Sequence, residues 1–286
     1  MDLLLAYEGL IAFVGINGLL ALSIYATLSC GQLSLANAGF MAIGAYTGAL
    51  ITLHAPAVPF IVVLLAAALA PSLVAVPLGL PVLRLRGVFL AIATVGFGEV
   101  VRLVFVNWDF TNGALGLVAI PQRTHVWTIY LALAVALYVL GRLRGSRAGY
   151  ALEAIREDET AARTMGIQST AYKLSMLVLG AALAGLAGAL EAHFTFIVSP
   201  AGYGFGRVVD MLVQAVVGGA AVFYGPVIGA AFLTVLPEVL RELGARLGLS
   251  PGPFRLFLNG VILLAVILYL PSGLASLPQR FRRRAA

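Results

Sequence analysis

Residues 9–83 read GLIAFVGINGLLALSIYATLSCGQLSLANAGFMAIGAYTGALITLHAPAVPFIVVLLAAALAPSLVAVPLGLPVL, a run of 75 residues without a single aspartate, glutamate, lysine or arginine. A soluble fold would expose part of so long a run to water and would need charged side chains there. The rest of the chain follows the same trend: 61% of its 286 residues are hydrophobic and 10% are charged, against about 25% charged in an average soluble domain. The sequence therefore indicates an integral membrane protein.

The apolar runs are continuous and about twenty residues long, the length that an α-helix needs to cross about 30 Å of hydrocarbon. A transmembrane barrel would instead alternate apolar and polar residues over segments of about ten. We therefore expect an all-α polytopic membrane protein, a single transmembrane domain over residues 1–286. It should have about nine transmembrane or re-entrant helices, at 9–28, 34–53, 58–80, 88–106, 126–141, 172–191, 208–223, 226–243 and 254–271. The run at 208–223 is short and ends in two glycines, so it is either a full span or a re-entrant segment.

Basic residues gather in three segments between or after these runs. Twelve of the 18 lysines and arginines lie at Arg84 and Arg86, in the stretch 142–173, or in the tail 279–286. Nine spans place all three segments on one side of the membrane, which the positive-inside rule makes the cytoplasm. The N-terminus is then outside and the C-terminus cytoplasmic. We interpret the basic tail as an anchor to anionic membrane lipid and not as a nucleic-acid site.

The loop 142–171 is long, whereas most other connections are short. It contains four of the twelve acidic residues, and Gly149 and Gly166 punctuate it. Its apolar residues recur at roughly helical spacing: Ala151, Leu152, Ile155, Ala162, Met165 and Ile167. This pattern predicts one or two short amphipathic helices, with Glu159 and Arg163 forming a favourable i,i+4 pair. The loop is either a solvated connector or a helix that docks on a cytosolic partner.

The sequence motifs of P-loop nucleotide-binding proteins, zinc metalloproteases and serine hydrolases are absent. The chain has no G-x-x-x-x-G-K-[ST], H-E-x-x-H or G-x-S-x-G pattern. Its single cysteine, Cys30, and its three scattered histidines give no metal-ligand spacing. We therefore expect no catalytic residue, cofactor or metal in this chain. If transport is driven by ATP, the ATPase must lie on another polypeptide.

Five ordered blocks of sequence resemble the LivM-type permease subunits of ABC importers for branched-chain amino acids, a family that also includes urea and short-chain amide permeases. The blocks are GQLSLANAGFMAIGAY at 31–46, LRGVFLAIAT at 85–94 with FGEVVR at 97–102, TNG at 111–113 with the pairs at 116–117 and 120–121, AIREDETAARTMGI at 154–167, and GG at 218–219 with GPVIG at 225–229 and LPE at 236–238. The resemblance implies a non-catalytic permease in a bacterial or archaeal inner membrane. The partners it implies are a homologous LivH-type permease, two cytosolic ATP-binding subunits that hold ATP and magnesium, and a periplasmic or surface-anchored substrate-binding protein.

The same resemblance identifies the loop 142–171 as a coupling segment that inserts into the ATPase. The importer signature is Glu-Ala-Ala, three residues, then Gly; here the alanines and the glycine match, but Thr160 replaces the glutamate and Glu159 lies one residue earlier. We assign ATPase coupling to Glu153, Arg156, Glu159, Ala161, Ala162 and Gly166.

The expected translocation path contains uncharged and charged polar residues within the apolar runs. Gln32, Ser34 and Asn37 can offer transient hydrogen bonds to a zwitterion, or they can bond only to neighbouring helices. Glu99 and Arg102 share a helix face, so they form either a structural ion pair or a substrate contact. Glu191 and His193 are expected at the membrane interface. Asp210 faces either a cavity or the outer surface.

An alternative function is a self-sufficient secondary transporter or channel for a small polar solute. That class favours acidic residues within the membrane for ion coupling and detectable repeats between the two halves of the chain. The sequence has few such acids and no convincing repeat. An ABC importer permease, coupling ATPase closure to alternating access, is therefore the preferred hypothesis.

Overall fold

The computed structural model describes residues 2–85, 87–219, 222–246, 260 and 273–276. Those residues form helices and connections without a β-strand, apart from one isolated antiparallel bridge between Leu117 and Val198. The helices of four or more turns are α1 (Asp2–Leu28), α2 (Asn37–His54), α3 (Phe60–Val82), α4 (Val88–Asn107), α5 (Val126–Arg144), α8 (Ser169–Thr195) and α10 (Gly225–Arg246). The shorter elements are α6 (Arg147–Glu157), α7 (Glu159–Thr164), α9 (Phe205–Gly218), η1 (Asp109–Thr111), η2 (Gly113–Leu115), η3 (Pro200–Tyr203) and η4 (Leu274–Ser276).

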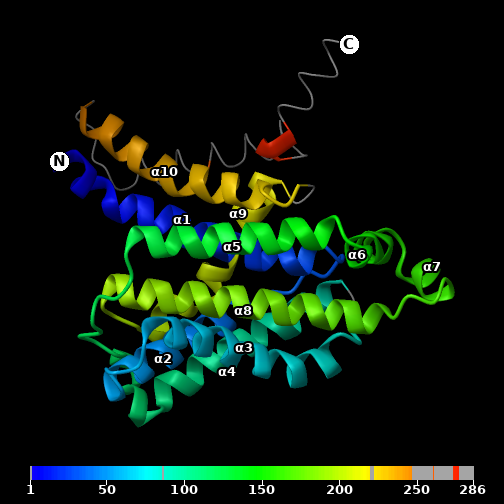
Figure 1. Cartoon of the computed structure of the whole chain (residues 1–286), viewed down its shortest axis with the longest axis horizontal. Helices are drawn as coiled ribbons and strands as arrows, with labels where there is room; N and C mark the ends of the chain where they lie inside the picture. The colour runs from blue at the N-terminus through cyan, green and yellow to red at the C-terminus, as the bar shows by residue number, and fades with distance from the viewer. Residues whose placement is uncertain (1, 86, 220–221, 247–259, 261–272, 277–286) are drawn as a thin grey trace.

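Five of these helices are long and apolar enough to cross a membrane: α1 from Tyr7 onward, α3, α4, α5 and α8. They have 19 to 27 residues, so each is at least about 28 Å long at 1.5 Å per residue. Figure 1 shows α1, α5, α8 and α10 running along one common direction. The predicted all-α polytopic membrane fold is confirmed.

Two predicted spans differ from the structure. The run at 34–53 becomes helical only at Asn37, and residues 32–36 before it are irregular. The run at 208–223 becomes α9, which ends at Gly218 and has 14 residues. A helix of 14 residues measures about 21 Å and is too short to span hydrocarbon alone. The predicted span at 254–271 and the tail at 279–286 lie outside the described residues.

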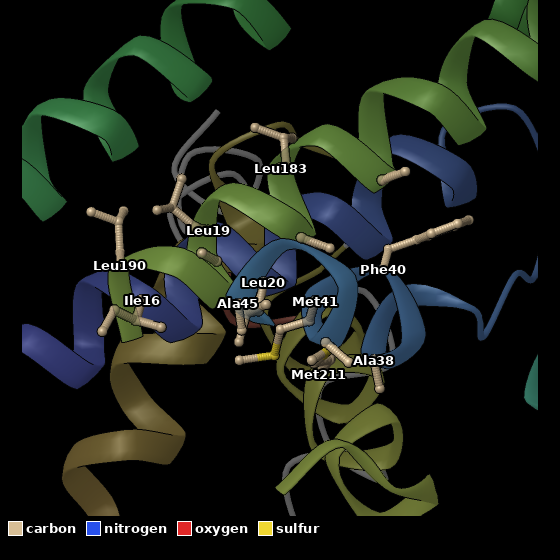
Figure 2. Packing of buried hydrophobic residues seen from close by; sticks show 14 of the residues in the cluster. Ile16, Leu19, Leu20, Ala38, Phe40, Met41, Ala45, Leu183, Leu190 and Met211 are labelled. Atoms are coloured by element: carbon tan, nitrogen blue, oxygen red, sulfur yellow. The ribbon is translucent and has the colours of Figure 1, made fainter. Parts of the chain in front are cut away.

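Helix α8 lies at the centre and packs against α1, α2 and α3. Glycines allow this approach: a Cβ added at Gly44 of α2 would lie 2.2 Å from the Cα of Gly185 in α8, and one at Gly188 would lie 2.2 Å from the Met41 carbonyl oxygen. In lipid, no hydrophobic effect drives helices together, so close van der Waals packing stabilises their association, and small residues at the contact permit it. Figure 2 shows the apolar side chains of α1, α2, α8 and α9 that fill the space around this contact.

Helices α9 and α10 are joined by a second glycine contact. A Cβ at Gly218 would lie 2.0 Å from the carbonyl oxygen of Gly225, and one at Gly229 would lie 2.1 Å from that of Gln214. Gly219 has φ +99°, a conformation that favours glycine. The two-glycine end of the apolar run therefore turns the chain sharply and ends α9 where the sequence predicted a longer helix.

Candidate functional site: a coupling hairpin and a buried polar segment

The loop 142–171 folds into two helices that project beyond the ends of α5 and α8 (Figure 1). Ser146 begins α6 by accepting a hydrogen bond from the N–H of Gly149 at 3.4 Å. Asp158 begins α7 by accepting hydrogen bonds from the N–H groups of Thr160 at 2.8 Å and Ala161 at 3.0 Å. Such caps satisfy the free donors at a helix start. Gly166, with φ +84°, reverses the chain after α7. We refer to residues 146–166 as the coupling hairpin.

One face of the coupling hairpin is buried and the other is exposed. Leu152, Ile155 and Ala162 are buried against the protein, as the helical spacing predicted. Met165 is different: it was predicted to share the apolar face, but it is 82% exposed. The reason is that α7 ends at Thr164, so Met165 no longer follows the helical periodicity. Tyr150 is also 68% exposed, which leaves two large side chains on the hairpin surface.

Glu159 connects the hairpin to α8. Its carboxylate accepts hydrogen bonds from Arg163 and Lys173, each at 2.7 Å, and from the Ser169 hydroxyl at 3.1 Å. The predicted pair with Arg163 is therefore present. Partial burial by itself would raise the pKa of Glu159, but Lys173, Ser169 and Arg163 together lower it below its ordinary value. The Glu159 carboxylate therefore bonds to other residues of this chain. The other predicted coupling residues on the exposed surface are Glu153, Arg156, Ala161 and Gly166.

This arrangement predicts a pH-dependent contribution to stability. Because the pKa of Glu159 is lowered on folding, its ion pairs stabilise the hairpin fully above the ordinary value of 4.5 and lose their effect as the pH falls through the lowered value. Glu159→Gln should therefore lower the melting temperature in detergent at pH 7, and this deficit should shrink as the pH falls through the lowered pKa of Glu159. Glu157→Gln, a control without an ion pair in the described structure, should shift melting little over the same pH range. A Glu159→Gln deficit that does not shrink as the pH is lowered would contradict this assignment.

Helix α6 touches the connection between α1 and α2. Gly31 has φ +74°, and a Cβ added there would lie 3.4 Å from the Cα of Arg156. Gly31 is followed directly by the irregular residues 32–36. The residue that the coupling hairpin contacts therefore immediately precedes the segment predicted to line the translocation path.

The polar residues of that segment are almost completely buried. Gln32 and Ser34 are 2% exposed and Asn37 is 1% exposed. The amide of Asn37 donates to the Ser23 hydroxyl at 2.8 Å, and the N–H of Leu35 donates to the Thr94 hydroxyl at 2.9 Å. Within the described structure, the whole amide of Gln32, the Ser34 hydroxyl and the Asn37 amide oxygen have no hydrogen-bond partner. Buried polar atoms of this kind are costly unless water or a solute binds them.

Glu99 and Arg102 form the predicted pair on α4, with Arg102 Nε donating to Glu99 Oε2 at 2.7 Å. The other carboxylate oxygen of Glu99 accepts the N–H of Phe205, the first residue of α9, at 3.1 Å. A carboxylate at a helix N-terminus is favoured by the helix dipole. The structure thus places this pair where it holds the start of α9. Glu99 also lines a small cavity together with Ala38, the neighbour of Asn37.

Two polar groups near the end of α8, which were predicted at the membrane interface, both have partners inside the protein. His193 is fully buried and hydrogen-bonds the Thr52 hydroxyl at 2.8 Å. Glu191 pairs with Arg207 of α9 at 2.5 Å, and about one fifth of each side chain is exposed. The partners are sixteen residues apart across an irregular connection, so local spacing gave no signal of the pair. The one sequence feature that pointed to this ion pair is the presence of opposite charges on either side of a connection that contains glycine and proline.

Asp210, for which the sequence left two alternatives, lines a cavity of about 410 Å³. The same cavity is lined by Asn17, Arg207, Gln214 and Thr234. Asn17 donates to the Thr234 hydroxyl at 2.9 Å and so joins α1 to α10. No group of three or more His, Cys, Asp or Glu side chains suited to a metal ion occurs in the part of the chain that the structure describes.

These features define a multi-pass helical membrane protein with a protruding helical hairpin. The family model described as "Branched-chain amino acid transport system / permease component" matches residues 6–267. The chain therefore belongs to this permease family.

Individual relatives agree with that assignment. The high-affinity branched-chain amino acid transport system permease protein LivM of Salmonella typhimurium is 32% identical over 290 residues, covering 89% of this chain and 66% of the relative. The chain thus spans about two thirds of the length of that relative. LivH of the same organism is 29% identical over 154 residues, covering 54% of this chain and 47% of LivH. PsaBC from Streptococcus pneumoniae, solved in complex with a Fab, superposes with a TM-score of 0.50 over 91% of this chain and 90% of its own; at 14% identity the similarity concerns the fold.

Proposed function

We propose that this chain is one transmembrane subunit of an ATP-driven importer for branched-chain or similar hydrophobic amino acids. The contact between Gly31 and Arg156 carries the mechanism, because it joins the coupling hairpin to the buried polar segment at residues 32–37. ATPase subunits that close on ATP would move the hairpin, and the hairpin would move this segment. Movement of packed elements between two arrangements is how alternating access is achieved.

The residues of this chain bind and move, and do not break bonds. In this proposal the exposed hairpin residues Glu153, Arg156, Ala161 and Gly166 face the ATPase, while Glu159 fastens α7 to α8. ATP and magnesium are bound by the ATPase subunits. The unpartnered groups of Gln32, Ser34 and Asn37 offer hydrogen bonds to a passing zwitterion without holding it by charge.

The proposed partners follow from the relatives. LivM and LivH of one organism both resemble this chain, which supports a homologous LivH-type permease as the second transmembrane subunit. Two cytosolic ATPases and a periplasmic or surface-anchored binding protein complete the assembly. The basic hairpin side is proposed to be cytoplasmic, with the N-terminus outside and the C-terminus inside.

Purification of the tagged chain from its native membrane in a mild detergent tests this proposal. We expect P-loop ATPases and a second permease to co-purify in fixed ratio, and the reconstituted complex with its binding protein to take up leucine only with ATP. Recovery of the chain alone, transporting a solute with an ion gradient and without ATP, would establish a secondary transporter instead.

A further inference from the structure

A third cavity, of about 350 Å³, lies between α6 and the ends of α1 and α5. Its volume is at the small end of the range for ligand-binding sites. Its apolar lining includes Leu140, Leu152 and Met176, which are 2%, 4% and 3% exposed. Leu152 and Met176 also pack with Ala26 and Cys30 in a separate small hydrophobic cluster. We call Leu140, Leu152 and Met176 the apolar floor of the cavity, and these side chains suit contact with a small apolar group.

Charges of both signs line the same cavity. Arg144 comes from the end of α5, and α6 contributes Glu153, Arg156 and Glu157. In the described part of the chain none of these four side chains forms an ion pair within 4 Å, although Glu153 and Arg156 are three residues apart on one helix. Two cations and two anions thus line one cavity without a direct ion pair among them, and Arg144 hydrogen-bonds Tyr25, which lines the same cavity. This pattern suits a ligand that itself carries one charge of each sign.

We propose that this cavity binds a free zwitterionic amino acid with an apolar side chain. The ligand carboxylate would pair with Arg144 and Arg156, the ammonium group with Glu153 and Glu157, and the side chain would lie on the apolar floor. The charged groups are at the protein surface, where each ion pair contributes little, so the site fills only when the amino acid accumulates. Three of the charged lining residues, Glu153, Arg156 and Glu157, belong to α6, and all three are exposed.

Occupancy would act on transport through α6. A ligand that bridges Arg144 of α5 to three residues of α6 restrains the helix that also contacts Gly31. Restraint of the coupling hairpin should slow the conformational cycle. This regulatory meaning rests on the proposed function: the transported amino acid would inhibit its own import from the side where it is released.

Direct binding tests the site without reference to transport. Radiolabelled leucine is equilibrated with the purified complex in detergent, without binding protein and without nucleotide. We expect saturable binding, weakened at least fivefold by Arg144→Gln and unchanged by Arg142→Gln, a matched loss of charge at the same helix end but outside the cavity lining.

A zwitterionic phospholipid headgroup carries the same two charges, so phosphoethanolamine serves as competitor. Leucine binding that is absent, unaffected by Arg144→Gln, or displaced by equimolar phosphoethanolamine would overturn the proposal.

Transport then tests the regulation. Proteoliposomes of the full transporter are loaded with leucine on the side of the hairpin, and the ratio of ATP-driven uptake with and without this load is measured. We expect the load to slow uptake severalfold in the unaltered chain and with Arg142→Gln, but much less with Arg144→Gln. An equal ratio for all three would overturn the regulatory role. These measurements also separate failure of the proposed function from failure of the cavity proposal. If the proposed function is wrong, the unaltered complex shows no ATP-driven uptake of a branched-chain amino acid. The binding measurement still tests the cavity in that case.

Discussion

Replacing Gly31 by valine is expected to reduce ATP-driven uptake at least tenfold while ATP hydrolysis continues. Gly31 adopts φ +74°, which costs a β-branched residue about 1–2 kcal/mol or more. Its new Cβ would lie 3.4 Å from the Cα of Arg156, and the branch methyl groups would extend further toward α6. The substitution therefore separates the coupling hairpin from residues 32–37 and breaks the proposed link between ATPase and membrane segment.

Two control substitutions separate this effect from backbone strain and from bulk. Gly87→Val also places valine at a positive φ, +56°, but a Cβ there meets nothing within 4 Å. Gly96→Val adds the same bulk within α4, again with nothing within 4 Å. Both should retain uptake within about twofold of the unaltered chain in the same proteoliposomes. If Gly31→Val also keeps its uptake, or if Gly87→Val loses as much, the contact with Arg156 is not the coupling element.

The spanning helices could be predicted because a long apolar run in lipid can satisfy its backbone only by helix formation. Hydropathy says nothing about where such a run stops being helical. Residues 32–36 are irregular, and the Leu35 N–H bonds to the Thr94 hydroxyl, 59 residues away. Helix α9 ends at Gly218, where a Cβ would lie 2.0 Å from the carbonyl oxygen of Gly225. Both departures depend on contacts between distant residues.

The family blocks correspond to such contacts. Gly39 lies in one block and Gly98 in another, and a Cβ at Gly39 would lie 3.1 Å from the Gly98 Cα. A Cβ at Gly116 would lie 2.0 Å from the Val198 carbonyl oxygen. These glycines preserve helix and loop packing, which explains why the blocks identify the family strongly and the substrate weakly. Uncharged polar residues such as Gln32 could be found from sequence because they interrupt an apolar run.

The pair between Glu191 and Arg207 could not be found in that way, and its removal is the second large effect that we expect. Arg207→Leu leaves the Glu191 carboxylate largely enclosed without its partner, and breaking a buried pair costs about 3–5 kcal/mol. Because about one fifth of each side chain is exposed, the lower end of that range applies, which corresponds to a melting temperature lower by at least about 5 °C. Glu191→Leu should have a similar effect.

A double-mutant cycle tests this assignment in detergent-solubilised protein by fluorescence-detected thermal melting. Replacing both residues by leucine should restore most of the lost stability, because a buried ion pair and an apolar pair of similar volume differ little in net free energy. Arg142→Leu, an exposed arginine outside this pair, is the matched control and should melt within about 1 °C of the unaltered chain. Single losses that simply add in the double variant would contradict a coupled pair. Since Arg207 lies in the first turn of α9 and Glu99 accepts the N–H of Phe205 in that same turn, a coupled pair would mean that α9 is held at its start from both α4 and α8.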